Sequence, residues 1–117
     1  MVLADTGYWL ALANRRDRWH GKAVAVTRSL AEPLVTTWPV LTETSHLMAR
    51  RLGVDAQLRF LEQVSVRVDI HEIVASRLGE MRALMDTYRD LPMDLADASL
   101  VLAARDRGDG RILSTDL

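Results

Sequence analysis

The chain contains no cysteine. This absence excludes a disulfide framework, a thiolate zinc site and a cysteine nucleophile, and it is compatible with the reducing cytoplasm in which we expect the protein to reside. Long apolar runs are also missing, because a charged residue interrupts each candidate well before the roughly 20 residues that a membrane span needs. The apolar first segment lacks a basic leader and contains Asp5, so we interpret it as folded structure. A membrane role is not expected.

Lysine is nearly absent, since Lys22 is the only lysine among 15 basic residues. The formal net charge of −1 excludes the strongly basic body that is typical of a non-specific nucleic-acid coat protein. With 117 residues, of which 49% are hydrophobic and 26% charged, the sequence favours one soluble globular domain spanning residues 1–117. We therefore look for a single functional site.

Short apolar and β-branched runs alternate with amphipathic stretches along the chain. Strands are predicted at residues 2–4, 34–38, 64–68 and 111–115. Helices are predicted at residues 6–13, 17–31, 39–51, 55–63, 70–88 and 94–105, and the last of these is so apolar that it must be buried. Strands that alternate with helices predict an α/β fold with a parallel sheet and right-handed crossovers.

Acidic residues stand at special places in this pattern. Asp5 and Asp116 each follow a short apolar strand, and Asp94 and Asp97 begin the buried helix. Glu43 lies in the opening turns of the helix after the second strand. Ligand sites of open α/β sheets lie beyond the carboxyl ends of the strands, near the point where strand order reverses. We therefore expect these acids to converge on one site.

Carboxylates that are gathered in a partly apolar pocket repel one another unless a cation joins them. Carboxylate oxygens without histidine or cysteine favour hard cations such as Mg²⁺ or Mn²⁺, which activate water for phosphodiester hydrolysis. Each acid alone has a structural alternative: a helix cap for Asp5 and Asp94, an arginine partner for Glu43, and a solvated chain end for Asp116. Asp97 is the hardest to explain in this way, because an unpaired carboxylate inside so apolar a helix would be costly.

The order of four segments resembles the PIN domain of VapC-like toxins from bacterial toxin–antitoxin pairs. The segments are VLADTGYWLAL, TTWPVLTE, MDLADASLVLAA and ILSTD. Each segment alone is a weak signal, and the specific signal is the spaced set. The resemblance implies a PIN-like three-layer sandwich, in which a central parallel sheet of four to five strands is flanked by helices. It also implies a homodimer and a cognate antitoxin protein as partner.

The activity that the resemblance implies is that of an Mg²⁺- or Mn²⁺-dependent endoribonuclease, the toxin of its pair, which hydrolyses RNA. The implied catalytic and metal-binding residues are Asp5, Glu43, Asp97 and Asp116. The implied accessory residues are Asp94, Thr6 and Thr115, with the two threonines supporting the carboxylates through hydrogen bonds.

Two other functions stay open on the sequence: a non-catalytic PIN-like interaction module, and a housekeeping nuclease that processes RNA. Asp5-Thr6-Gly7 also spells the catalytic tripeptide of aspartic proteases, but those enzymes are rich in strands where this chain predicts helices. A phosphoacceptor receiver domain would need a lysine after a late strand, and Lys22 is far from that position.

Histidines and tryptophans are not predicted to form the site. His20, His46 and His71 are predicted on separate helices without metal-ligand spacing, so we interpret them as surface or packed side chains. We interpret the tryptophans as core or interface anchors rather than base-stacking platforms. They are Trp9, Trp19 and Trp38.

Overall fold

The computed structural model describes residues 1–108 and 110–114. Its strands are β1 (Val2–Ala4), β2 (Leu34–Thr37), β3 (Val68–His71) and β4 (Ile112–Leu113). They form one sheet in the order β3-β2-β1-β4, with every pair parallel. The helices are α1 (Thr6–Ala13), α2 (His20–Ser29), α3 (Trp38–Leu52), α4 (Val54–Arg67), α5 (Leu78–Thr87) and α6 (Leu95–Arg107), with a 3₁₀ turn η1 (Ala75–Arg77) before α5. The predicted parallel α/β class is confirmed.

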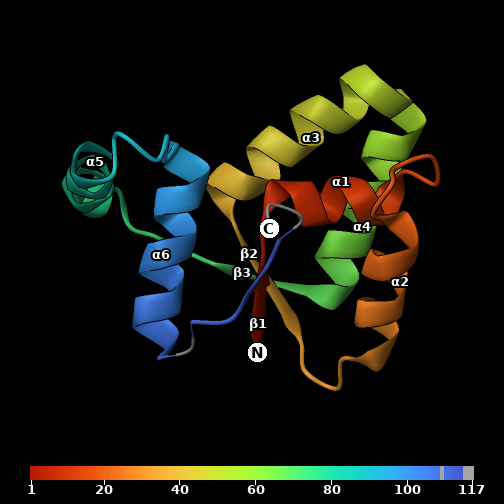
Figure 1. Ribbon diagram of the computed structural model, residues 1–117, viewed down its shortest axis with the longest axis horizontal. Helices are drawn as coiled ribbons and strands as arrows, with labels where there is room; N and C mark the ends of the chain where they lie inside the picture. The colour runs from red at the N-terminus through yellow and green to blue at the C-terminus, as the bar shows by residue number, and fades with distance from the viewer. Residues whose placement is uncertain (109, 115–117) are drawn as a thin grey trace.

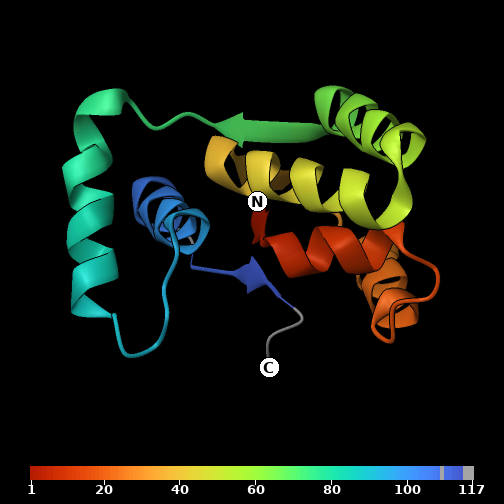
Figure 2. The same ribbon diagram turned by 90° about the horizontal axis from the view of Figure 1, so that it is seen from above.

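The elements are arranged in three layers (Figures 1 and 2). Helices α5 and α6 cover one face of the sheet, and α1, α2 and α4 cover the other. Helix α3 starts where β2 ends and extends over the end of the sheet at which the strands finish (Figure 1). The expected three-layer sandwich is confirmed, with four strands in the described part of the chain.

Strand order reverses beside β1, which pairs with β2 on one side and with β4 on the other. The amide of Asp5 donates to the carbonyl of Leu113 at 3.0 Å, so the end of β1 stays next to β4. Such a reversal leaves a crevice at the carboxyl ends of the strands. The residue that follows β1 therefore lies at the place where a ligand site is expected.

The main core lies between the sheet and the helices α1, α3 and α4, and it includes the fully buried Leu3, Val35 and Met48. Trp9 is 5% exposed and meets the ring of Phe60 edge-on at 5.9 Å, so its prediction as a core anchor is confirmed. Trp38, in contrast, is 54% exposed and is not part of this core. No helix in the described ranges is long and apolar enough to cross a membrane.

The strand predicted at residues 64–68 is wrong, because α4 continues to Arg67. Phe60 and Val64 are four residues apart and both buried, so they form one face of a helix that packs on the core. Tertiary packing thus outweighs the β propensity of the valines. The strand begins only at Val68, which pairs with Leu34.

Two predicted helix starts are also wrong. Ile70 and His71 belong to β3, where they pair with Thr36 and Thr37, so the predicted helix 70–88 begins only at Leu78. Helix α2 begins at His20 rather than at residue 17, because the Asp17 side chain accepts from the amide of Trp19 at 2.7 Å in the turn before the helix. At the first place pairing with β2 keeps the backbone extended, and at the second a side-chain acceptor forms a turn before the helix.

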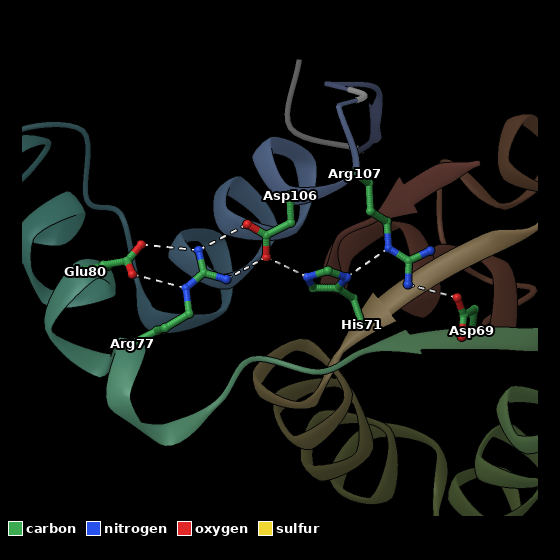
Figure 3. Close-up of polar contacts among 6 residues, drawn as sticks. All are labelled: Asp69, His71, Arg77, Glu80, Asp106 and Arg107. Atoms are coloured by element: carbon green, nitrogen blue, oxygen red, sulfur yellow. Dashed lines mark hydrogen bonds and ion pairs between the residues drawn. The ribbon is translucent and has the colours of Figure 1, made fainter.

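A chain of charged side chains joins the edge strand β3 to α6 and to the start of α5 (Figure 3). Arg77 bonds Asp106 through two nitrogens, at 2.6 and 3.1 Å, and this pairing, followed by the bond from His71, lowers the pKa of Asp106 to about 2. Arg107 donates to His71 Nδ1 at 2.9 Å, so His71 Nε2 is the nitrogen that donates to Asp106. The other two members are Asp69 and Glu80. His71 thus lies on a strand and not on the predicted helix.

Candidate metal centre

Asp5 lies directly after β1 and caps α1. Its Oδ1 accepts from the amide of Tyr8 at 2.9 Å, as an N-cap carboxylate does. Asp5 therefore does act as a helix cap, which is the structural alternative considered for it. It does not exclude a second role, because a carboxylate has two oxygens and this bond uses one of them.

Asp94 and Asp97 form a reciprocal capping box at the start of α6. The amide of Asp97 donates to Asp94 Oδ1 at 2.8 Å, and the amide of Asp94 donates to Asp97 Oδ2 at 3.2 Å. Asp97 is exposed and takes part in this cap, so it too has a structural role, and the expected cost of a buried unpaired carboxylate does not arise. The neighbouring Ala96 and Ala98 point into the core instead.

Glu43 is carried by α3, and a buried hydroxyl pair connects α3 to α6. Thr37 caps α3, and its Oγ1 lies 2.6 Å from Ser99 Oγ. Ser99 also donates to the carbonyl of Ala96 at 2.6 Å, and both hydroxyl side chains are fully buried. This pair holds the helix that carries Glu43 against the helix that carries Asp97.

These elements enclose a hollow of about 330 Å³ at the carboxyl ends of the strands. It is lined by Asp5, Thr6, Gly7, Leu10, Val40, Glu43, Pro92, Asp94, Ala96, Asp97 and Leu100. Four acids from three separate segments of the sequence thus share one hollow with apolar walls. The other two residues of the predicted set, Asp116 and Thr115, lie outside the described residues.

The acids in this hollow disfavour one another's charge. Burial, followed by repulsion from Asp94, raises the pKa of Glu43. Partial burial also raises the pKa of Asp97, and the charges of Asp94 and Asp5 act in the same direction. The hydroxyl of Thr6 makes no hydrogen bond of ordinary geometry in the described ranges, yet it lies close enough to Glu43 to favour the ionised form. The hollow thus has an excess of negative charge that a cation would relieve.

The chemistry of the hollow fits a hard cation. All its charged groups are carboxylates, and its orphaned hydroxyl is a further oxygen donor. Among residues 1–108 and 110–114, however, no three acidic or histidine side chains are drawn together closely enough to be a metal cluster as they stand. The acids line the hollow without closing on its centre. A cation there would draw them inward.

The sequence did not predict a second, apolar hollow beside the first. It is lined by Trp38, Pro39, Thr42, Glu43, His46, Asp94, Leu95 and Ala96, and its volume is about 650 Å³. The residue that could have indicated this hollow is Trp38, which stands at the strand–helix junction before Glu43. We interpreted it from the sequence as a core or interface anchor.

Fold and site together define a class of protein. It is a parallel α/β domain in which a carboxylate-lined hollow that suits a divalent cation lies where the strand order reverses. Two curated proteins of Mycobacterium tuberculosis resemble the chain. Ribonuclease VapC26 is 27% identical over 116 residues, which are 98% of this chain and 86% of that protein. The 23S rRNA-specific endonuclease VapC20 is 40% identical over 53 residues, which are 45% of this chain and 40% of that protein.

A crystal structure of Mycobacterium tuberculosis VapC20, described as a Sarcin-Ricin loop cleaving toxin, has the same fold. The TM-score is 0.91 at 24% sequence identity, and the match covers 99% of this chain and 90% of that one. No family model matches the chain. Together with the acidic hollow at the switch point, these likenesses show that the chain resembles the VapC ribonucleases in sequence and shares the fold of VapC20.

Proposed function

We propose that this protein is an endoribonuclease toxin that hydrolyses RNA phosphodiester bonds with Mg²⁺, or Mn²⁺ as an alternative, held by its acidic hollow. The observation that carries the proposal is the convergence of Asp5, Glu43 and Asp97 on one hollow, from three different helix starts. The likeness to proteins named as ribonuclease and rRNA endonuclease supports the same activity.

In this proposal Asp5, Glu43 and Asp97 bind the cation, and Asp94 is an accessory acid at the mouth of the hollow. From the family resemblance alone, Asp116 is assigned an assisting role and Thr115 an accessory one. When bound, the cation lowers the pKa of a water molecule and neutralises the charge that develops on the phosphate. A carboxylate of the set would accept the proton of the attacking water, and the Thr6 hydroxyl would favour the ionised form of Glu43.

The apolar walls of the hollow support the acids. Leu10, Val40 and Leu100 line it from α1, α3 and α6. They limit the water around the carboxylates, so an electrostatic interaction between site and phosphate is screened less than it would be on an open surface. The same desolvation raises the pKa of Glu43 in the absence of a cation.

The test is RNA cleavage by wild-type protein and by Asp5→Asn and Asp97→Asn. Asparagine keeps a side-chain oxygen that accepts the backbone bonds, so both variants should remain folded. Wild type should cleave RNA with Mg²⁺ or Mn²⁺ and stop with a chelator, and both variants should lose cleavage. Glu62→Gln on the exposed side of α4 is the matched control and should retain it. Equal cleavage by all four proteins would contradict the assignment.

We further propose a cognate antitoxin protein and a homodimer. A non-catalytic PIN-like module and a housekeeping nuclease remain the alternatives. Expression in a bacterial host separates them: a toxin arrests growth, Asp97→Asn does not, and co-expression of a small DNA-binding protein from the neighbouring reading frame restores growth. A housekeeping nuclease would leave growth unchanged in all three cultures.

A further inference from the structure

The apolar hollow beside the acids, which we call the Trp38 groove, is continuous with the metal centre. Glu43, Asp94 and Ala96 line both hollows. An RNA chain whose phosphate lies among the acids can therefore place an adjacent nucleotide at the entrance to this groove. Apart from the two shared acids, its walls are mainly apolar and come from the first turns of α3 and α6.

Two large apolar side chains are exposed along this groove. Trp38 is 54% exposed and Leu95 is 40% exposed, and each is the first residue of its helix. Exposed apolar surface that gathers beside a polar site is typical of binding surfaces rather than of the remaining protein exterior. An indole in such a place presents a flat π face to a ligand.

The backbone that carries Trp38 is held in place before any ligand arrives. The preceding Thr37 is fully buried and paired with Ser99 at 2.6 Å. The hydroxyl of Thr42 donates to the carbonyl of Trp38 at 2.8 Å. A side chain on so fixed a backbone loses little conformational entropy when a ligand packs against it. The groove is thus built on rigid elements.

The charges of the groove select what it can hold. Glu43 and Asp94 make the end near the metal centre negative, so a second phosphate would be repelled there. A nucleobase is flat and uncharged, and unpaired bases stack on exposed aromatic side chains in many RNA-binding proteins. The groove therefore suits the base and not the backbone of the substrate.

We propose that the Trp38 groove binds an unpaired nucleobase adjacent to the scissile phosphate, so that Trp38 is a specificity-determining residue of the nuclease. The proposal rests on the proposed ribonuclease function. It makes the substrate class more specific: the site takes single-stranded or looped RNA, because a base within a duplex cannot leave its stack to reach the indole without the cost of unpairing.

The test measures RNA binding in an Asp97→Asn background, where the oligonucleotide is not consumed. Trp38→Ala should weaken binding of a fluorescent single-stranded oligonucleotide by about five-fold to more than a hundred-fold, the range for loss of one base–aromatic stack. Trp38→Phe should retain most of the affinity. Tyr88→Ala is the matched control, because Tyr88 is 41% exposed and lines neither hollow. Thermal melting checks that each variant is folded.

A second arm separates stacking from a general loss of fit. A series of oligonucleotides carries one abasic nucleotide at successive positions. At one position next to the cleaved bond, the abasic nucleotide should lower the affinity of the protein that retains Trp38. At the same position it should not lower the affinity of Trp38→Ala any further. Such non-additivity is the signature of a direct contact. Additive losses at every position would overturn the proposal.

Two further outcomes are decisive. If Trp38→Ala converts a dimer into a monomer in sedimentation while its affinity for RNA is unchanged, the groove is a contact between copies of the chain and the proposal is wrong. If wild type cleaves no RNA, the proposed function fails, whereas the coupling of Trp38 to one abasic position still tests the groove by itself. The two failures are therefore distinguishable.

Discussion

Replacement of Ser99 by alanine should destabilise the protein out of proportion to the single atom removed. Ser99 Oγ donates to the carbonyl of Ala96 and pairs with Thr37 Oγ1, each at 2.6 Å, and both side chains are fully buried. Because Ser99 donates its proton to Ala96, Thr37 is the donor of the shared bond, and without Ser99 its buried O–H has no acceptor, although its oxygen still accepts the amide of Val40 at 3.4 Å. A buried polar group that is left unsatisfied costs about 1–3 kcal/mol.

For a domain of this size, each kcal/mol lowers the melting temperature by about 4 °C, so we expect a fall of about 4–12 °C. Urea unfolding followed by circular dichroism gives the free energy of unfolding directly. Ser65→Ala is the matched control, because Ser65 makes the same hydrogen bond to the carbonyl three residues earlier, at 2.7 Å, on an exposed helix face. Its effect should stay within about 0.5 kcal/mol. Equal losses in the two variants would refute the role assigned to the buried pair.

Two other predictions concern the acids and the turns. The pKa values of Glu43 and Asp97 are raised in the folded protein, so in the presence of a chelator the stability that these groups contribute should fall as pH rises above about 4. Mg²⁺ should restore this stability at pH 7. Thermal melts of wild type and Glu43→Gln across this pH range check both effects. Asp106, whose folded pKa is about 2, loses its contribution only as pH falls below about 4, so it does not act in that window. Gly53→Ala should lower the free energy of unfolding by about 1–3 kcal/mol. Gly53 has φ 93° with open space around it, so the loss comes from backbone strain and not from a steric clash. Gly79→Ala, inside α5 and also in open space, should instead stabilise the protein by up to about 1 kcal/mol in denaturant titration; the same sign for both glycine variants would contradict this reasoning.

Local signals were enough to predict most of the fold. Asp5 and Thr37 each stand between a short apolar run and a helix, and Asp94 stands between a turn and a helix, so β1 and the starts of α1, α3 and α6 could be located from neighbouring residues. Residues 64–68 could not be assigned in this way, because a valine-rich segment satisfies a strand and one face of a helix equally. Its conformation is decided by Phe60 and the core behind it.

The acids of the site were predictable because each stands next to a recognisable boundary between elements. The contacts that position them were not. Thr37 and Ser99 are 62 positions apart, and nothing in either local sequence marks the other as its partner. The network of His71, Arg77 and Asp106 likewise joins residues from three elements whose meeting depends on the packing of α5 and α6. Trp38 was recognised as large and apolar, but its exposure follows only from the fold.

The capping box at the start of α6 couples ligand binding to helix formation. One oxygen of Asp97 accepts the backbone amide of Asp94 at 3.2 Å. Each carboxylate oxygen has two lone pairs, so this oxygen can keep the amide bond while the carboxylate binds a cation, and the bond then holds the ligand in its orientation. Asp97 would therefore serve the helix and the proposed metal centre together. Replacement by asparagine, which keeps an acceptor oxygen, would separate the two roles, whereas replacement by alanine would remove both.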